Sequence, residues 1–384
     1  MECSATLKYK KSLQNYLGDT DIYLYWKGRV GLFSLLKAMG VGEGDEVILP
    51  AFTCVVVPNA ILYLGAMPVY VDIDPETFNM DVSNLESAVT TKTKVILAQN
   101  TYGLSTNVEK IVAIAKQHNL YTIEDCTHGF GGKYEEKPNG SYCDAAFYST
   151  QWNKPHSTGI GGFALLSNEK LKKALLDVNQ LLDSPSAKEI MSLRLQLFAR
   201  KYFLVESTYW KLLKVYRFLS SRNLVVGSSS SEEINSINMP KGFLKSSSSL
   251  QAKAGLKAIN NLKGVITLRE KNASIYTEFL KKNGKNHVLE KLNKNHSFLK
   301  YPLRVSSRDD FFKCAEKAQI SLGDWFTSPL HPVENDLHLW HFEPDEFPHA
   351  MLAASQVINL PTDLNKRSLQ RVLTFLKANL QLIL

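Results

Sequence analysis

An alternation of strand-like and helix-like segments runs from Gly28 to about Ser167, and it constrains the fold more than any other feature of the sequence. Apolar spacing and turn residues predict helices at 29–41, 55–66 and 108–119 and strands at 44–50, 67–74, 93–100 and 120–126. Short buried strands that alternate with helices are typical of a parallel sheet covered by helices on both faces. We therefore predict an α/β fold with a large, mostly parallel sheet.

Polar residues follow three of the expected strands. Asn100 and Tyr102 come after 93–99, Asp125 ends the next strand, and Ser149 ends a strand in the segment "DAAFYS". Right-handed crossovers bring the carboxyl ends of parallel strands to one edge of the sheet. A ligand site is expected at that edge.

The bulk composition limits the class of protein. With 384 residues, of which 44% are apolar and 21% charged, the chain is long enough for a large domain and a smaller one. The net charge of +8 includes no block of five like charges, so we expect no nucleic-acid partner. The five cysteines are widely spaced and form no CxxC pair, which favours free thiols in a reducing compartment.

Neither targeting nor membrane insertion is indicated. The first nineteen residues lack an apolar core of signal-peptide length. The apolar run from Val55 to Val71 is interrupted by two prolines, an asparagine and a glycine, so it is unsuited to a spanning helix. We expect a cytoplasmic protein.

A basic amphipathic segment covers 185–222 and holds eight basic and two acidic residues. It carries an apolar seam at steps of three and four residues, made of Leu195, Phe198, Tyr202, Val205, Tyr209, Leu212, Tyr216 and Leu219. The favoured interpretation is packing within the chain or a dimer contact. The alternative is peripheral contact with an acidic membrane surface.

The remaining segments suggest the domain boundaries. Two serine runs, at 227–233 and 245–253, lie before a long helical pattern and shorter mixed elements. We predict an N-terminal tail over 1–20, a large domain over 21–249 and a small α+β domain over 250–384.

Asp125 and Lys154 together indicate cofactor chemistry. Alone, Asp125 is equally consistent with a helix cap, and Lys154 with one more surface lysine. As a pair that follows neighbouring strands, they are the groups that pyridoxal phosphate requires. A carboxylate keeps the pyridine nitrogen protonated, and an amine carries the aldehyde. The hydroxyl of Ser149 is a candidate phosphate ligand.

Five separated motifs make the resemblance specific. The run 40–81 and the segments "TKTKVILAQNTYG", "IEDCTHGFGGKY", "FYSTQWNKPHSTGIGGF" and "LQAKAGLKAINNL" resemble the DegT/DnrJ/EryC1/StrS family of sugar aminotransferases. The resemblance covers about 28–162 and then 250 to the C-terminus. It implies the aspartate aminotransferase-like fold (fold type I), pyridoxal 5'-phosphate as cofactor and a homodimer with active sites at the subunit interface.

The resemblance also assigns roles to residues. The lysine that carries the cofactor falls on Lys154, the pyridinium-binding aspartate on Asp125, and the residue against the cofactor ring on His128. The phosphate-binding serine falls on Ser149. The family's dehydratase branch has histidine in place of the lysine, so Lys154 implies an aminotransferase.

Three positions depart from the family pattern. The usual Ser-Gly-Thr motif at a helix N-terminus is replaced by Lys27, Gly28 and Arg29, which Val30 follows. The amides near Val30 remain suited to a phosphate, and Arg29 is a candidate for an added contact. Cys54 replaces a common aromatic residue. Leu244 replaces the asparagine that the partner subunit sends to the phosphate, with Lys245 or Ser246 as possible substitutes.

The resemblance implies the transfer of an amino group, typically from glutamate, to a keto-sugar on a nucleotide or similar carrier. In "DWFTSPLHP", His331 matches a residue that approaches the sugar, and a structural histidine is the alternative. Two other functions stay open. One is a non-catalytic descendant that binds a partner or a membrane surface, and the other is a dehydratase or lyase that uses the same cofactor.

Overall fold

The large domain is built on one central sheet. The computed structural model describes residues 4–18, 20–203, 231–289 and 295–384. Seven strands take the order β1-β10-β9-β6-β5-β2-β4. Their bounds are β1 Asp21–Tyr25, β2 Glu46–Pro50, β4 Met67–Val71, β5 Thr93–Gln99, β6 Tyr121–Asp125, β9 Ala145–Ser149 and β10 Gly162–Leu166. The strands from β9 to β4 pair in parallel, whereas β10 is antiparallel to both of its neighbours. The predicted parallel sheet is therefore confirmed.

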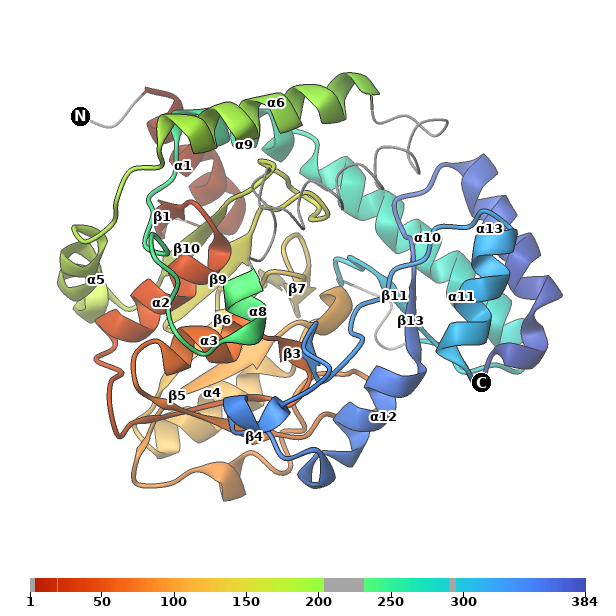
Figure 1. The fold of residues 1–384 in the computed structure, drawn as a ribbon, viewed down its shortest axis with the longest axis horizontal. Helices are drawn as coiled ribbons and strands as arrows, with labels where there is room; N and C mark the ends of the chain where they lie inside the picture. Colours follow the sequence, from red (N-terminus) through yellow and green to blue (C-terminus); the bar gives the residue numbers. More distant parts are fainter. Residues whose placement is uncertain (1–3, 19, 204–230, 290–294) are drawn as a thin grey trace.

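Helices cover both faces of this sheet (Figure 1). The helices that alternate with its strands are α2 Gly28–Ala38, α3 Val56–Leu62 and α4 Val108–Gln117. Successive side chains of a strand point to opposite faces. Val95 and Leu97 accordingly share a core with α2 and α3, whereas Ile96 packs with residues of α4. Burial on both faces explains why these strands are continuously apolar in sequence.

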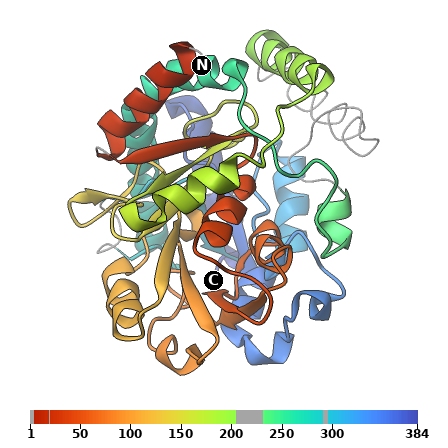
Figure 2. The same cartoon turned by 90° about the vertical axis from the view of Figure 1, so that its left-hand side faces the viewer.

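The N-terminal segment, predicted as a tail over 1–20, forms a packed helix. Helix α1 (Ser4–Leu17) buries Tyr9, Leu13 and Leu17. It lies beside α9 (Ser249–Ile259), as Figure 2 shows at the top of the molecule. Gly255 permits this approach, because a Cβ atom there would lie 2.3 Å from Cζ of Tyr9. The alternation of charged and apolar residues in this segment is the pattern of a half-buried helix.

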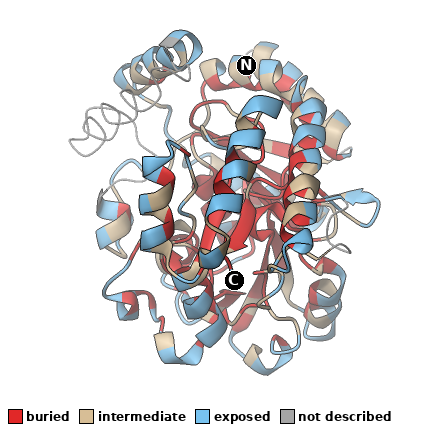
Figure 3. Cartoon of the chain, turned by 90° about the vertical axis from the view of Figure 1, so that its right-hand side faces the viewer, coloured by how far each residue is buried: buried red, intermediate tan, exposed pale blue. Residues whose placement is uncertain are grey.

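The smaller lobe contains a two-stranded antiparallel sheet and several helices. Its elements are α10 Leu262–Lys282, β11 Tyr301–Arg304, α11 Arg308–Lys317, α12 Pro348–Gln356, β13 Val357–Leu360 and α13 Lys366–Ala378. Figure 3 shows its helices with exposed outer faces and the buried strands behind them.

Contacts with the large domain cross the predicted boundary at residue 250. Strand β12 (Leu330–His331) pairs in parallel with β3 (Thr53–Cys54), which follows β2. The indole of Trp340 donates a hydrogen bond to Asn59 at 2.6 Å. Part of the range 250–384 therefore packs on the large domain through a separate two-stranded sheet next to the end of β2.

Helix α6 (Ala187–Phe203) contains the first part of the predicted basic segment. It packs through Leu193 against Trp26 and Ile160, whereas the seam residues Leu195 and Phe198 are 60% and 54% exposed. The rest of the seam, from Val205 to Leu219, lies outside the described residues. No helix in the described ranges has the length and apolar character needed to cross a membrane.

Candidate active site

The candidate site lies where β5, β6 and β9 end. Register pairs Gln99 with Asp125, and Asp125 with Phe147 of β9. Ser149 lies two residues beyond Phe147 on β9. Asp125 and Ser149 are therefore on neighbouring strands at the predicted ligand edge.

Asp125 is a buried carboxylate, only 3% exposed. Its Oδ1 accepts a hydrogen bond from the amide of Thr127 at 2.8 Å, and a turn rather than a helix follows it. Burial raises the pKa of Asp125 to about 6, while the hydrogen bonds from Thr127 and the charge of Lys154 act in the opposite direction. The side chain therefore caps a turn and still interacts electrostatically with the lysine.

Lys154 lies in the loop between β9 and β10, and its amide donates to the carbonyl of Gln151 at 3.0 Å. Its Nζ atom is 4.7 Å from the centre of the Trp325 ring. Burial lowers the pKa of Lys154 to about 8, although the charges of Asp125 and Cys54 raise it. A lowered pKa increases the share of the neutral, nucleophilic amine at physiological pH.

His128 forms one wall of the site. Its ring stacks on Trp325 with centroids 5.0 Å apart and planes 3° apart. Burial and the nearby cation of Lys154 lower the pKa of His128 well below its usual value. Its Nδ1 accepts from the amide of Tyr102 at 3.2 Å, so the neutral ring carries its proton on Nε2. A flat aromatic group therefore already stacks on His128.

The phosphate end predicted from the sequence is formed by α2 and β9. The N-terminus of α2 presses on the end of β9, because a Cβ atom on Gly28 would lie 2.8 Å from the carbonyl oxygen of Tyr148 and 3.3 Å from Cα of Ser149. The amide of Val30 donates to the carbonyl of Lys27 at 3.1 Å, and no side chain caps this helix. The first-turn amides of α2 and the hydroxyl of Ser149 therefore share one region that favours an anion.

Arg29 contacts a carboxylate that sequence reasoning missed. Its guanidinium donates to Glu233 at 2.5 Å, and both side chains are almost fully buried. Nζ of Lys27 lies 3.7 Å from the same carboxylate, which belongs to the short helix α8 (Ser231–Asn235). A contact between Arg29 and a phosphate stays a prediction, and it has to compete with this ion pair. Nothing in "SSEEIN" distinguishes Glu233 from a surface glutamate.

The substitutes proposed for Leu244 make contacts within the chain. Lys245 pairs with Glu189 of α6 at 2.5 Å, and the hydroxyl of Ser246 donates to the carbonyl of Asp183 at 3.2 Å. Their contact with a phosphate stays a prediction.

His331 is brought to the site by β12, where it pairs in register with Cys54. Its Nδ1 lies 3.1 Å from the hydroxyl of Thr327, and its ring is 5.5 Å from that of Phe326. Burial lowers the pKa of His331 to about 4. A neutral histidine therefore lies near Phe326, which also stacks on His128.

The sequence reasoning also missed Trp325 and Lys300 as site residues. Trp325 stacks on His128, and Nζ of Lys300 is 5.9 Å from the centre of the same indole. Both residues belong to the C-terminal part of the chain and reach the site through long-range contacts.

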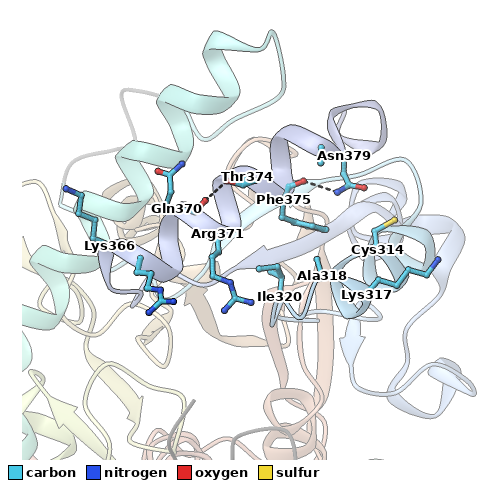
Figure 4. Close-up of a pocket in the computed structure, with 12 residues that line it drawn as sticks. Cys314, Lys317, Ala318, Ile320, Lys366, Gln370, Arg371, Thr374, Phe375 and Asn379 are labelled. Atoms are coloured by element: carbon cyan, nitrogen blue, oxygen red, sulfur yellow. Dashed lines mark hydrogen bonds between the residues drawn. The ribbon is translucent and has the colours of Figure 1, made fainter. Parts of the chain in front are cut away.

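A separate open groove lies in the small lobe between α11 and α13 (Figure 4). Lys317, Lys366, Arg367 and Arg371 line it, with Phe375 at its base. It contains none of the residues of the candidate active site.

The residues present fit pyridoxal phosphate. Asp125 supplies the buried carboxylate for a ring nitrogen, and Lys154 supplies an amine of lowered pKa that interacts with that carboxylate. Ser149 and the close-packed N-terminus of α2 supply a cradle for a phosphate. This set of donors combines a carboxylate, an amine and an anion site, as the cofactor requires.

The comparisons with known proteins agree with this geometry. The model of the DegT/DnrJ/EryC1/StrS aminotransferase family matches residues 3–193 and 217–377. The GDP-perosamine synthase of Escherichia coli O157:H7 is 44% identical over 144 residues, which are 38% of this chain and 40% of that protein. The corresponding enzyme of Caulobacter vibrioides is 38% identical over 165 residues, which are 43% of this chain and 44% of that protein. These matches span less than half the length of either relative.

Similarity to an uncharacterized protein of Methanocaldococcus jannaschii extends further, with 28% identity over 93% of this chain and 84% of that protein. Among solved structures, an aminotransferase of the DegT DnrJ EryC1 StrS type from Brucella abortus superposes with a TM-score of 0.75 at 21% identity, covering 98% of this chain and 90% of that one. A putative sugar aminotransferase from Streptococcus pneumoniae in its PMP form gives 0.76 at 20% identity, covering 98% and 92%. These superpositions confirm the predicted fold.

Proposed function

Because the chain belongs to the DegT/DnrJ/EryC1/StrS aminotransferase family, we propose that it is a pyridoxal-phosphate-dependent aminotransferase acting on a keto-sugar. The observation that carries this proposal is the pair of Lys154 and Asp125. Each is buried, and the charge of each favours the ionised form of the other. Lys154 also argues against a sugar dehydratase, because the dehydratase branch replaces this lysine with histidine.

The residues divide the chemistry between them. When bound, pyridoxal phosphate supplies an electron sink for the bond that breaks at the amino carbon of the substrate. Asp125 keeps the ring nitrogen protonated, and Ser149 with the first-turn amides of α2 holds the phosphate. Lys154 would hold the aldehyde end of the cofactor, and its amine would move the proton at the amino carbon of the donor. Neutral His128 packs against the ring without adding charge.

For the substrates, we propose glutamate as the donor and a nucleotide-linked keto-sugar as the acceptor. The support is that the partial relatives include proteins named GDP-perosamine synthase and UDP-2-acetamido-2-deoxy-3-oxo-D-glucuronate aminotransferase. The positive charges of Lys154 and Lys300 in one site also suit anionic substrates.

The proposal includes a cytoplasmic homodimer. The exposed aromatic face of α6, with Phe198 and Tyr202 more than half exposed, supports a contact with a second copy. Light scattering of the purified protein tests the dimer. Sedimentation with phosphatidylglycerol vesicles tests the alternative, membrane contact through 185–222.

The decisive experiment is the absorbance spectrum of purified protein mixed with pyridoxal phosphate. We expect a band near the visible edge that Lys154→Ala abolishes and that the exposed control Lys170→Ala retains. Glutamate should bleach the band with stoichiometric formation of 2-oxoglutarate. Identical spectra with and without Lys154 contradict the proposal, and turnover of a sugar without consumption of glutamate indicates a dehydratase or lyase.

A further inference from the structure

Lys300 is a second lysine of the candidate active site, beside the same indole that Lys154 contacts. The two Nζ atoms lie 4.7 Å (Lys154) and 5.9 Å (Lys300) from the centre of the Trp325 ring. Two backbone-anchored contacts fix this arrangement. The amide of Lys300 donates to the carbonyl of Tyr102 at 3.1 Å, and the amide of Tyr102 donates to Nδ1 of His128. Lys300 is therefore held beside the wall of the site by the fold.

The charge of Lys300 has no close partner in the described part of the chain. Asp363, the carboxylate with the largest effect on its charge, is 3.1 Å from Arg269. No carboxylate of the described residues lies within 4 Å of the Lys300 ammonium group. Its side chain is enclosed by protein yet keeps contact with solvent. A largely enclosed cation without a counter-ion favours the binding of an anion from solution.

We propose that Lys300 binds the carboxylate on the amino carbon of the donor, beside the Trp325 indole that both lysines contact. This assignment rests on the proposed function. In an amino acid the carboxylate is attached to the same carbon as the reacting nitrogen, so its counter-ion has to lie near the reactive lysine. The diphosphate of a nucleotide-linked acceptor lies across a whole sugar ring from the reacting carbon. The position of Lys300 beside the indole that Lys154 contacts therefore favours the donor carboxylate.

The test uses the holoenzyme and two amines. L-glutamate carries the carboxylate on its amino carbon, and 4-aminobutanoate carries the same reactive amine and side-chain carboxylate without it. The concentration of each that gives half of the spectral change is measured for the wild type, Lys300→Met, Lys300→Arg and the exposed control Lys313→Met. GDP binding is measured in parallel by calorimetry, and circular dichroism confirms that each variant is folded.

We expect Lys300→Met to raise the glutamate concentration needed for half of the spectral change by on the order of tenfold to a hundredfold, because a hydrogen bond to a charged group is lost. The half-change concentration of 4-aminobutanoate should change less than twofold, and Lys300→Arg should recover part of the glutamate response. A change in the pKa of Lys154 affects both amines alike, so the ratio of the two isolates the carboxylate.

The assignment is overturned if Lys300→Met shifts the half-change concentrations of the two amines equally, or shifts neither of them. Weaker GDP binding with an unchanged glutamate response also overturns it, and assigns Lys300 to the acceptor. Failure of the proposed function is visible separately, since the wild type itself then shows no bleaching by glutamate.

Discussion

The lowered pKa of Lys154 predicts how capture of the cofactor depends on pH. The neutral amine is the form that attacks an aldehyde, so the rate follows the neutral fraction of this side chain. Burial lowers the pKa of Lys154 from 10.5 to about 8, and the nearby cation of Lys300 acts in the same direction. The neutral form is therefore populated well below the range of an ordinary lysine.

The size of the effect follows from the two pKa values. With a pKa of about 8, roughly 10% of Lys154 is neutral at pH 7, against roughly 0.03% for a lysine of pKa 10.5. The environment of the site thus contributes about 300-fold to the reactive population at neutral pH. The unfolded chain binds more protons than the folded one between the two values, so the stability of the cofactor-free protein rises with pH across this window.

The measurement is the rate at which cofactor-free protein gains its visible-edge band after mixing with pyridoxal phosphate, from pH 6 to pH 10. The rate should rise about tenfold per pH unit up to about pH 8 and then level off. In Lys300→Met, which removes a neighbouring cation, the plateau should move to higher pH. A wild-type rate that keeps rising tenfold per unit through pH 10 would falsify the assigned environment of Lys154.

Three further substitutions test separate parts of the structure. Glu233→Gln leaves Arg29 facing an uncharged amide and should lower the free energy of unfolding in urea by about 3 kcal/mol. Inorganic phosphate should restore more stability to this variant than to the wild type. Equal responses of the two proteins to phosphate exclude a link between this ion pair and the anion site. Tyr9→Phe removes the buried 2.6 Å hydrogen bond to His156 and should cost about 1–2 kcal/mol in the same assay, so an unchanged midpoint contradicts the packing of α1 on the lysine loop. Ser149→Ala should weaken binding of pyridoxal phosphate by on the order of tenfold with little change in stability, and unchanged affinity removes this hydroxyl from the phosphate site.

The central sheet was predictable because local sequence is sufficient to define it. The strands expected around 44–50, 67–74, 93–100 and 120–126 are present as β2, β4, β5 and β6. Their continuous apolar runs reflect burial on both faces, which depends little on distant parts of the chain. For the same reason the positions of Asp125 and Ser149 at strand ends followed directly from the order of the elements.

The contacts of Arg29 and Lys300 were not predictable in this way. Glu233 lies 204 residues from Arg29 in sequence. Lys300 reaches the site only because its backbone is fixed to Tyr102. Neither contact leaves a spacing or composition signal, because it depends on how separate elements pack. The helix at 4–17 was not predictable for a related reason, since Tyr9 packs against Gly255 of the distant helix α9.

The charges of the site divide into two groups with different consequences. At the N-terminus of α2, Lys27 and Arg29 already face Glu233, so a phosphate there binds chiefly to backbone amides and Ser149. Lys154 and Lys300 both lie near the indole of Trp325. The carboxylate that interacts with Lys154 is Asp125. If Lys154 holds a cofactor, Lys300 would be the lysine of this pair that keeps its ammonium group beside the indole. Because Lys300 belongs to the C-terminal part of the chain and Lys154 to the large domain, the proposed binding of an anionic donor beside both lysines would depend on the relative position of the two lobes.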